Sequence, residues 1–239
     1  MPAEASGCRN YQGVAWYRKH FVIPQDMKGK EVSLHFEGAM GKQVIYLNGK
    51  RVQEHLGGYL PFTVQLTEQG VQPGDSCLLA VMTDNSDDKN FPPGKRQYTL
   101  DFAYHGGIYR DVWMISAPDI HFAQWGIGWH ATSLTDKQAV VVVDMEVEKH
   151  VKAAGALEVS AALYDAEGTL VAQGRKKVAD KAEGIAKETV SLKVKKPRRW
   201  NLDAPYLYTL KTELLCDGKR IDGSSTNVGL RTLKFDANK

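Results

Sequence analysis

The sequence predicts an all-β protein made of two β-sandwiches, a jelly roll followed by an immunoglobulin-like domain. Three observations support this prediction. Many short segments alternate between apolar and polar residues, which is the period of a half-buried strand. Gly, Pro, Asn and Asp separate these segments at close intervals. The first half of the chain contains no convincing amphipathic helix.

The first half divides into seven expected strands joined by turns. Asn48-Gly49 is the strongest hairpin signal among them, because both positions tolerate a positive φ. Pro73-Gly74-Asp75 marks a second turn, and an apolar run from Cys77 onward predicts a buried strand. The expected strands are residues 16–23, 32–36, 44–47, 50–52, 62–66, 77–82 and 111–115.

The second half predicts seven or eight further strands, which fits an immunoglobulin-like sandwich. Its turns include residues 165–168 and Asp217-Gly218, and the polar stretch 177–187 is expected to be a loop or a helical turn. We place the boundary near Pro118-Asp119, so that the domains are residues 1–118 and 119–239. The expected strands are residues 122–131, 140–147, 157–163, 169–174, 189–194, 206–215, 219–221 and 229–235.

Composition excludes several classes of protein. The chain has 239 residues, of which 43% are hydrophobic and 25% charged, as in a globular protein. The net charge of +3 is small and the basic residues are scattered, so we expect no nucleic-acid partner. No segment approaches the ~20 apolar residues of a membrane span, so we expect no membrane partner. The N-terminus lacks a signal-peptide pattern. The compartment stays open: periplasmic if a signal peptide has been trimmed, otherwise cytoplasmic.

Three cysteines, Cys8, Cys77 and Cys216, are too few and too widely spaced for a disulfide framework or a metal site. Cys77 and Cys216 lie in apolar strand patterns, where cysteine packs as a small hydrophobic residue. The histidines show no HxH or HExxH spacing, so we expect neither a metal nor a cofactor.

A long loop rich in Pro and Gly leads from Asp84-Asn85-Ser86, through Pro92-Pro93-Gly94, to Asp101 and Gly106-Gly107. Long loops on a rigid sheet are where binding residues collect. A purely structural interpretation is also open, in which Asp101 caps a turn and Arg110 forms an ion pair.

The sequence offers no complete active site. A hydrolase needs an acid and a base or nucleophile fixed near each other. The chain has no GxSxG elbow, P-loop or GxGxxG motif. Its candidate carboxylates fall at strand ends or turns, or at outward strand positions: Glu31, Glu37, Glu54 and Glu68 in the first group, and Glu146, Glu148, Glu158 and Glu213 in the second.

Several motifs form a recognisable set: residues 16–21, 36–38, 44–49, 84–86, 92–94 and 101–112 in the first half, and 200–208 and 228–232 in the second. As a set, they resemble glycoside hydrolase family 2, the family of β-galactosidases, β-glucuronidases and β-mannosidases. The first half resembles the N-terminal sugar-binding, galactose-binding-like jelly roll of that family. The second half resembles its immunoglobulin-like domain.

The resemblance implies a role in carbohydrate metabolism and a third domain, a (β/α)₈ barrel that carries two catalytic glutamates. This chain stops where the family enters that barrel. We therefore expect a two-domain fragment with an artificial boundary, with no catalytic residue of its own, whose partners are a β-linked sugar and the missing barrel. Whether the full-length protein is a homo-oligomer stays open.

The resemblance also suggests roles for individual residues. Asp101 occupies the position of an acid that hydrogen-bonds a sugar hydroxyl, and Asn85 is expected at the rim of that pocket. Gly106, Gly107, Arg110 and Asp111 are expected to structure the loop.

Three interpretations remain. The first is the non-catalytic part of an exo-glycosidase, with β-galactosidase favoured over β-glucuronidase. The second is a stand-alone carbohydrate-binding module. Trp125 and Trp129 would fit that module, but their place at the start of the second domain favours packing at the seam between domains. The third is a structural pair of sandwiches, which leaves the long loop unexplained.

Overall fold

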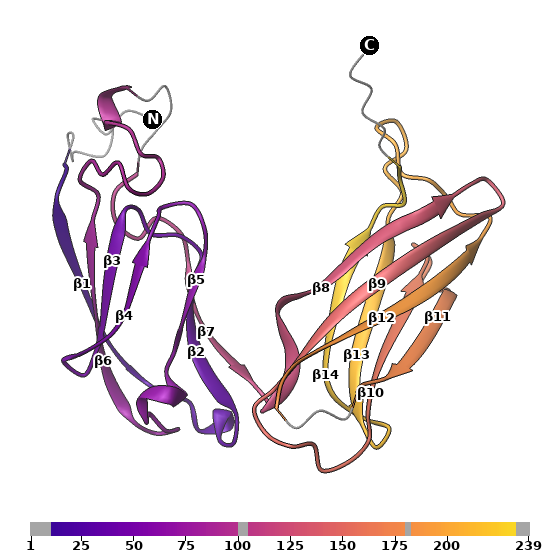
Figure 1. Ribbon diagram of the computed structural model, residues 1–239, viewed down its shortest axis with the longest axis horizontal. Helices are drawn as coiled ribbons and strands as arrows, with labels where there is room; N and C mark the ends of the chain where they lie inside the picture. The colour runs from indigo at the N-terminus through magenta and orange to yellow at the C-terminus, as the bar shows by residue number, and fades with distance from the viewer. Residues whose placement is uncertain (1–10, 100–104, 180–182, 233–239) are drawn as a thin grey trace. The chain divides into compact units, whose positions relative to one another are not determined.

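The computed structural model describes residues 11–99, 105–179 and 183–232. The chain divides into two compact units, Met1–Ala117 and Pro118–Lys239. The described residues contain strands and three short 3₁₀ helices, Gln25–Met27, Thr67–Gln69 and Gln97–Thr99, and no α-helix (Figure 1). None of the helices found there is long and apolar enough to cross a membrane. The predicted all-β class is confirmed.

The first unit is a sandwich of two antiparallel sheets. One sheet has the order β1-β6-β3-β4, and the other has the order β5-β2-β7. The strands are β1 (Val14–Val22), β2 (Glu31–Phe36), β3 (Lys42–Leu47), β4 (Lys50–Leu56), β5 (Phe62–Gln65), β6 (Ser76–Asp84) and β7 (Val112–Ala117).

The core of the first unit lies between these sheets and follows from the alternation seen in the sequence. Every second residue of β6 is buried, beginning with Cys77. Phe36 stacks on Phe62 with ring centroids 4.7 Å apart, and His55 lies over the same Phe62 ring at 4.3 Å. Burial lowers the pKa of His55 below its ordinary value.

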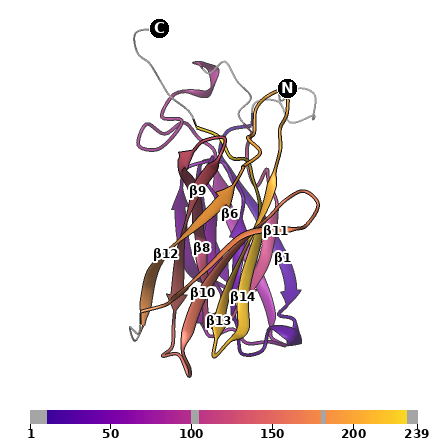
Figure 2. The same cartoon turned by 90° about the vertical axis from the view of Figure 1, so that its right-hand side faces the viewer.

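The second unit is also a two-layer sandwich, with sheet orders β12-β9-β8 and β11-β10-β13-β14 (Figures 1 and 2). Seven strands in two antiparallel sheets form an immunoglobulin-like arrangement. The strands are β8 (Ile120–Leu134), β9 (Gln138–Lys149), β10 (Leu157–Tyr164), β11 (Leu170–Lys177), β12 (Gly184–Lys195), β13 (Tyr208–Cys216) and β14 (Lys219–Val228).

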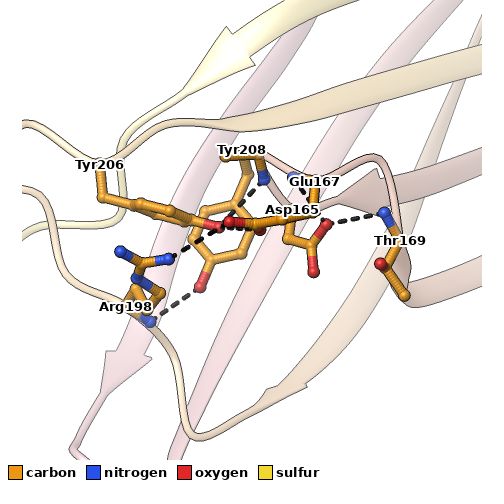
Figure 3. Close-up of polar contacts among 7 residues, drawn as sticks. Asp165, Glu167, Thr169, Arg198, Tyr206 and Tyr208 are labelled. Carbon is orange, nitrogen blue, oxygen red and sulfur yellow. Dashed lines mark hydrogen bonds and ion pairs between the residues drawn. The ribbon is translucent and has the colours of Figure 1, made fainter.

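Two tyrosines close the corner between β12 and β13, a position where immunoglobulin-like domains often place a tyrosine (Figure 3). The hydroxyl of Tyr208 accepts a hydrogen bond from the Arg198 N–H at 2.8 Å. The Arg198 guanidinium lies 3.9 Å from the ring centre of Tyr206, and the Tyr206 hydroxyl accepts from the Ala166 N–H at 3.0 Å. Burial raises the pKa of Tyr208, so its hydroxyl stays neutral in this network. The corner is therefore fixed to the turn between β10 and β11.

Both predicted hairpin turns are confirmed. Asn48 and Gly49 have φ values of 51° and 82°, and Asp217 and Gly218 have 49° and 77°. Positive φ at both central residues is the geometry of a type I′ turn, whose twist matches that of the flanking strands. The predicted packing of cysteines is also confirmed, since Cys77 is buried and Cys216 packs against the core of the second unit.

Two predictions about strands were wrong. The stretch 184–187, expected in a loop or helical turn, forms the start of β12. Two of the inward residues of β12 are Ala186 and Glu188, a small and a charged residue, so the sequence lacks the usual alternation of large apolar and polar residues there. Glu188 is buried and forms an ion pair with Lys176 at 3.0 Å.

Among the described residues the last strand is β14, which reaches Val228, whereas residues 229–232 of the strand predicted at 229–235 lie outside any strand. Residues 233–235 fall outside the described part of the chain. β14 is an edge strand with mostly exposed polar side chains, so the sequence pattern predicted only its first residues, 219–221.

Trp125 and Trp129 lie in different surroundings. Trp125 is 79% exposed and has a φ of 62° at a bulge where the register of β8 against β9 shifts. Trp129 packs against the core of the second unit. The two rings therefore do not form one row on the surface of this unit.

Candidate functional site: the loop between β6 and β7

Asn85 ties the start of the loop to the segment that precedes β1. Its side chain is 4% exposed. Its Oδ1 accepts from the Gly13 N–H at 2.9 Å, and its Nδ2 donates to the Tyr11 carbonyl at 3.0 Å. An asparagine suits this position because its amide carries both an acceptor and a donor. Both ends of the amide are thus engaged within the protein, and the expected contact with a sugar stays a prediction.

Side chains and backbone amides of the loop itself hold its first half. The Asp87 carboxylate accepts from the Gln97 N–H at 3.0 Å and from Gln12 Nε2 at 3.2 Å. Gln97 Nε2 in turn donates to the Asn85 carbonyl at 2.6 Å. Asp88 accepts from the Asn90 N–H at 2.8 Å, which is a local Asx turn. These carboxylates therefore serve as acceptors within the loop.

A hollow of about 230 Å³ lies in the same part of the loop. The peptide bond between Pro92 and Pro93 is cis. Charged side chains dominate the walls of the hollow, which is lined by Asp87, Asp88, Lys89, Gly94, Lys95 and Arg96. The hollow is partly open to solvent, unlike the enclosed cavities that bind small molecules.

Gly106 and Gly107 fix the far end of the loop by close packing. A Cβ on Gly106 would lie 2.7 Å from Asn85 Nδ2, so the two ends of the loop meet there. Gly107 has a φ of +73°, and a Cβ on it would lie 2.0 Å from the Tyr17 hydroxyl oxygen. Only glycine accepts both the positive φ and the close approach without strain. The structuring role expected of these glycines stays a prediction.

Beyond the two glycines, backbone hydrogen bonds hold the end of the loop on residues 37–40. The Met40 N–H donates to the Gly107 carbonyl at 2.9 Å, and the Glu37 N–H donates to the Asp111 carbonyl at 3.0 Å. Between them, Ile108 forms an isolated β-bridge with Ala39. The loop therefore returns to the sandwich along residues 37–40, just before β7.

Tyr109 and Arg110 pack over Gly38. The Tyr109 hydroxyl donates to the Gly58 carbonyl, and the Arg110 guanidinium lies 5.6 Å from the centre of the Tyr109 ring. A Cβ on Gly38 would lie 2.9 Å from the Tyr109 ring. No carboxylate in the described part of the chain forms an ion pair with Arg110. Its guanidinium lies over an aromatic ring there, and the ion pair of the structural interpretation is not seen.

Asp101 lies outside the described residues, as do its neighbours 100 and 102–104. Its role in binding stays a prediction. The structure does describe both flanks: the anchored start at Asn85 and the anchored end at Gly107. Sequence reasoning did not identify Tyr11, Gly13, Tyr17 or Gly38 as parts of these anchors.

The described groups of this site supply no evident pair for bond cleavage. Partial burial raises the pKa of Tyr59, and the nearby Tyr109 adds to the shift, so the Tyr59 hydroxyl stays neutral. Several carboxylates elsewhere are held in ion pairs with strand neighbours: Glu146 with Lys187, Glu158 with Arg175, and Glu213 with Arg220.

Comparison with known proteins matches both units. The sugar binding domain of glycosyl hydrolases family 2 matches residues 1–118, and a second profile of glycosyl hydrolases family 2 matches residues 127–231. A β-galactosidase of Thermoanaerobacter pseudethanolicus is 31% identical over 95% of this chain and 29% of its own length. A β-galactosidase of Bacteroides ovatus is 33% identical over 95% of this chain and 26% of its own.

The solved structure of Bacteroides uniformis β-glucuronidase 2 superposes with a TM-score of 0.84 and 30% identity, over 95% of this chain and 27% of that one. The chain thus spans between a quarter and a third of the length of these relatives. The chain belongs to glycosyl hydrolase family 2, and its two units are the sugar-binding domain and the immunoglobulin-like domain of that family.

Proposed function

We propose that this chain is the non-catalytic N-terminal part of a retaining exo-glycosidase, which hydrolyses the O-glycosidic bond of a β-linked sugar. The catalytic glutamates belong to a (β/α)₈ barrel in the rest of that enzyme. The observation that carries this proposal is the loop from Asn85 to Asp111, anchored at both ends on the unit that matches the sugar-binding domain.

Within that enzyme, Asp101 is the substrate contact and Asn85 positions the loop that carries it. A carboxylate accepts strong, charge-assisted hydrogen bonds from sugar hydroxyls. The buried amide of Asn85 and the close packing at Gly107 hold the two flanks of the Asp101 segment in place. Rigid flanks reduce the entropy lost when a loop binds its ligand.

Of the two activities found among the relatives, we propose β-galactosidase. The 33% identical relative from Bacteroides ovatus is a β-galactosidase, whereas a 31% identical relative from Formosa agariphila is a putative β-glucuronidase. Turnover of aryl β-galactoside and aryl β-glucuronide by the enzyme that carries this chain decides between them. Faster turnover of the glucuronide would overturn this choice and leave the rest of the proposal intact.

The proposal predicts that this chain alone does not hydrolyse aryl glycosides. Turnover above the buffer background would contradict it, because the chain would then contain a catalytic pair. The control is the same preparation heated past its unfolding temperature, which reveals any contaminating hydrolase that survives.

A stand-alone carbohydrate-binding module is the second candidate, favoured by exposed rings on the first unit. Trp16 on β1 is 46% exposed and lies 5.7 Å from the ring of Tyr46 on β3, with Arg18 5.4 Å above the Trp16 ring. Sugar rings stack on such aromatic side chains. Galactoside affinity of the isolated chain that disappears in Trp16→Ala but survives in Asp101→Ala would favour this candidate.

A further inference from the structure

We propose a zinc-binding site in the second unit, formed by His121, Glu148 and His150. The site is independent of the sugar-binding loop. It lies at the start of β8 and the end of β9, next to the residue Pro118 that begins this unit.

The backbone ladder brings the three side chains together. His121 on β8 stands directly opposite Glu148 on β9 in the antiparallel register. His150 follows two residues after Glu148, and its N–H donates to the Asp119 carbonyl at 2.9 Å, which continues the ladder past the end of β9. Residues two apart on a strand share a face, and so do directly opposed residues on neighbouring strands. A Glu-x-His pair and one cross-strand histidine therefore meet on a rigid surface.

The three side chains lie close enough for small adjustments to bring them onto a single ion. His150 Nε2 lies 3.2 Å from one oxygen of the Glu148 carboxylate, and His121 Nε2 lies 3.9 Å from the other. A ring nitrogen of His121 and one of His150 lie within 4.8 Å of each other. Zinc ligands sit at about 2.0–2.2 Å from the ion, so two of them on a tetrahedral ion are about 3.3 Å apart. Rotamer adjustments of under 1 Å for the carboxylate, and of up to about 1.5 Å between the two imidazoles, would close the site.

A hydrogen bond behind His121 orients its ring as a metal ligand. Its Nδ1 lies 2.7 Å from the Pro118 carbonyl oxygen. Because a carbonyl can only accept, Nδ1 carries the hydrogen and Nε2 points toward Glu148. In the neutral ring, Nε2 carries a lone pair that faces the Glu148 carboxylate. A positive ion between the two would be attracted by both. A backbone carbonyl bonded to the other ring nitrogen is the usual outer support of a zinc-bound histidine.

The imidazole rings of His121 and His150 are also stacked, and part of the site is exposed to solvent. The His121 and His150 rings are nearly parallel, at 7°, with centroids 5.8 Å apart. The side chain of His121 is 13% exposed, that of Glu148 is 35% exposed and that of His150 is 37% exposed. Two imidazoles and one carboxylate are the donor set of many zinc sites, with water in the remaining position. His121 is thus mostly buried and fixed, whereas Glu148 and His150 are exposed enough for an ion to reach them.

The test is calorimetric titration of Zn²⁺ into the untagged chain after chelator treatment, with the visible absorption of Co²⁺ as a second readout. We expect one zinc per chain and a higher melting temperature in its presence. His150→Gln should weaken binding at least about tenfold, the lower end of what even an outer partner of a metal costs. Glu148→Gln should do the same, and it covers the case in which His150→Gln fails to fold.

The matched control is His130→Gln, which removes another histidine of β8 that faces a carboxylate of β9. His130 lies 3.8 Å from Asp144, and both side chains are more than half exposed. This variant should bind zinc as the unchanged chain does. Absence of zinc binding in the unchanged chain would overturn the proposal and leave an imidazolium–carboxylate pair. Equal affinity in His150→Gln, Glu148→Gln and the unchanged chain would also overturn it, because zinc would then bind elsewhere.

Discussion

Gly107 allows the anchoring of the loop to be tested quantitatively. An alanine there must adopt a φ near +73°, which costs an L-residue about 1–2 kcal/mol. It must also move the Tyr17 hydroxyl, which would lie 2.0 Å from the new Cβ. Overpacking of this kind adds about 1–3 kcal/mol, toward the low end because the end of a half-exposed side chain can shift. We therefore expect Gly107→Ala to lower the unfolding free energy of the first unit by about 2–4 kcal/mol.

Gly29 provides the matched control for backbone strain. Its φ is +72°, and nothing lies within 4 Å of a Cβ built on it. Gly29→Ala should therefore cost only the conformational part, about 1–2 kcal/mol. In a Tyr17→Phe background the hydroxyl is gone, so the cost of Gly107→Ala should fall toward that of Gly29→Ala.

The assay must report on the first unit alone, because a two-unit chain need not unfold in one step. Hydrogen exchange of peptides from β2 and β6 along a urea series does so. Trypsin cleavage at Lys95 or Arg96 gives a second readout of the loop, and Gly107→Ala should accelerate it. If Gly107→Ala costs no more than Gly29→Ala, and Tyr17→Phe changes neither cost, the loop is not packed against β1 as described.

Three further predictions test other contacts. Asn85→Ala should lower the unfolding free energy of the first unit by about 2–4 kcal/mol, because two hydrogen bonds are lost and the Gly13 N–H is left unpaired; a loss below about 0.5 kcal/mol in the same assay would contradict this. His55 has a lowered pKa when folded, so the unfolded chain takes up the proton first and stability falls as the pH drops below about 6.5. His55→Phe should reduce this acid loss of melting temperature, and an identical loss in both proteins would rule out the explanation. Arg198→Ala should lower the unfolding free energy of the second unit by about 0.5–1 kcal/mol, because it removes the contact with the Tyr206 ring. Arg199→Ala breaks only an exposed ion pair and should lower that free energy by less. Equal effects of the two variants in urea unfolding would count against the stacking contact.

The parts of the fold that the sequence predicted well are those determined by neighbours in the chain. The alternation of β6 and the Asn48-Gly49 turn depend on residues one or two positions apart. Residues 222–228 of β14 and the first residues of β12 were missed because long-range pairing with β13 and β9 decides them. In these stretches polar or small residues replace the hydrophobic alternation, so local pattern carries little signal.

The candidate site divides in the same way. Proline and glycine in the sequence indicated a long loop, but not what holds it. Asn85 finds its partner Gly13 at a distance of 72 positions along the chain, and Tyr109 finds Gly58 at 51. The proposed zinc site has the same origin, because Glu148 and His150 are two residues apart whereas His121 joins them only through strand register.

The central proposal is that the anchored loop brings Asp101 to the substrate of a β-galactosidase. The most direct measurement is kcat/KM for an aryl β-galactoside in the hydrolase that carries this chain, with Asp101→Ala compared with Asp136→Ala, an exposed acid of the second unit. A hydrogen bond to a charged group contributes about 1.5–3 kcal/mol, so Asp101→Ala should reduce kcat/KM by roughly 10- to 150-fold. Asp136→Ala should leave it unchanged. A value for Asp101→Ala within twofold of that of the unchanged enzyme would contradict the account.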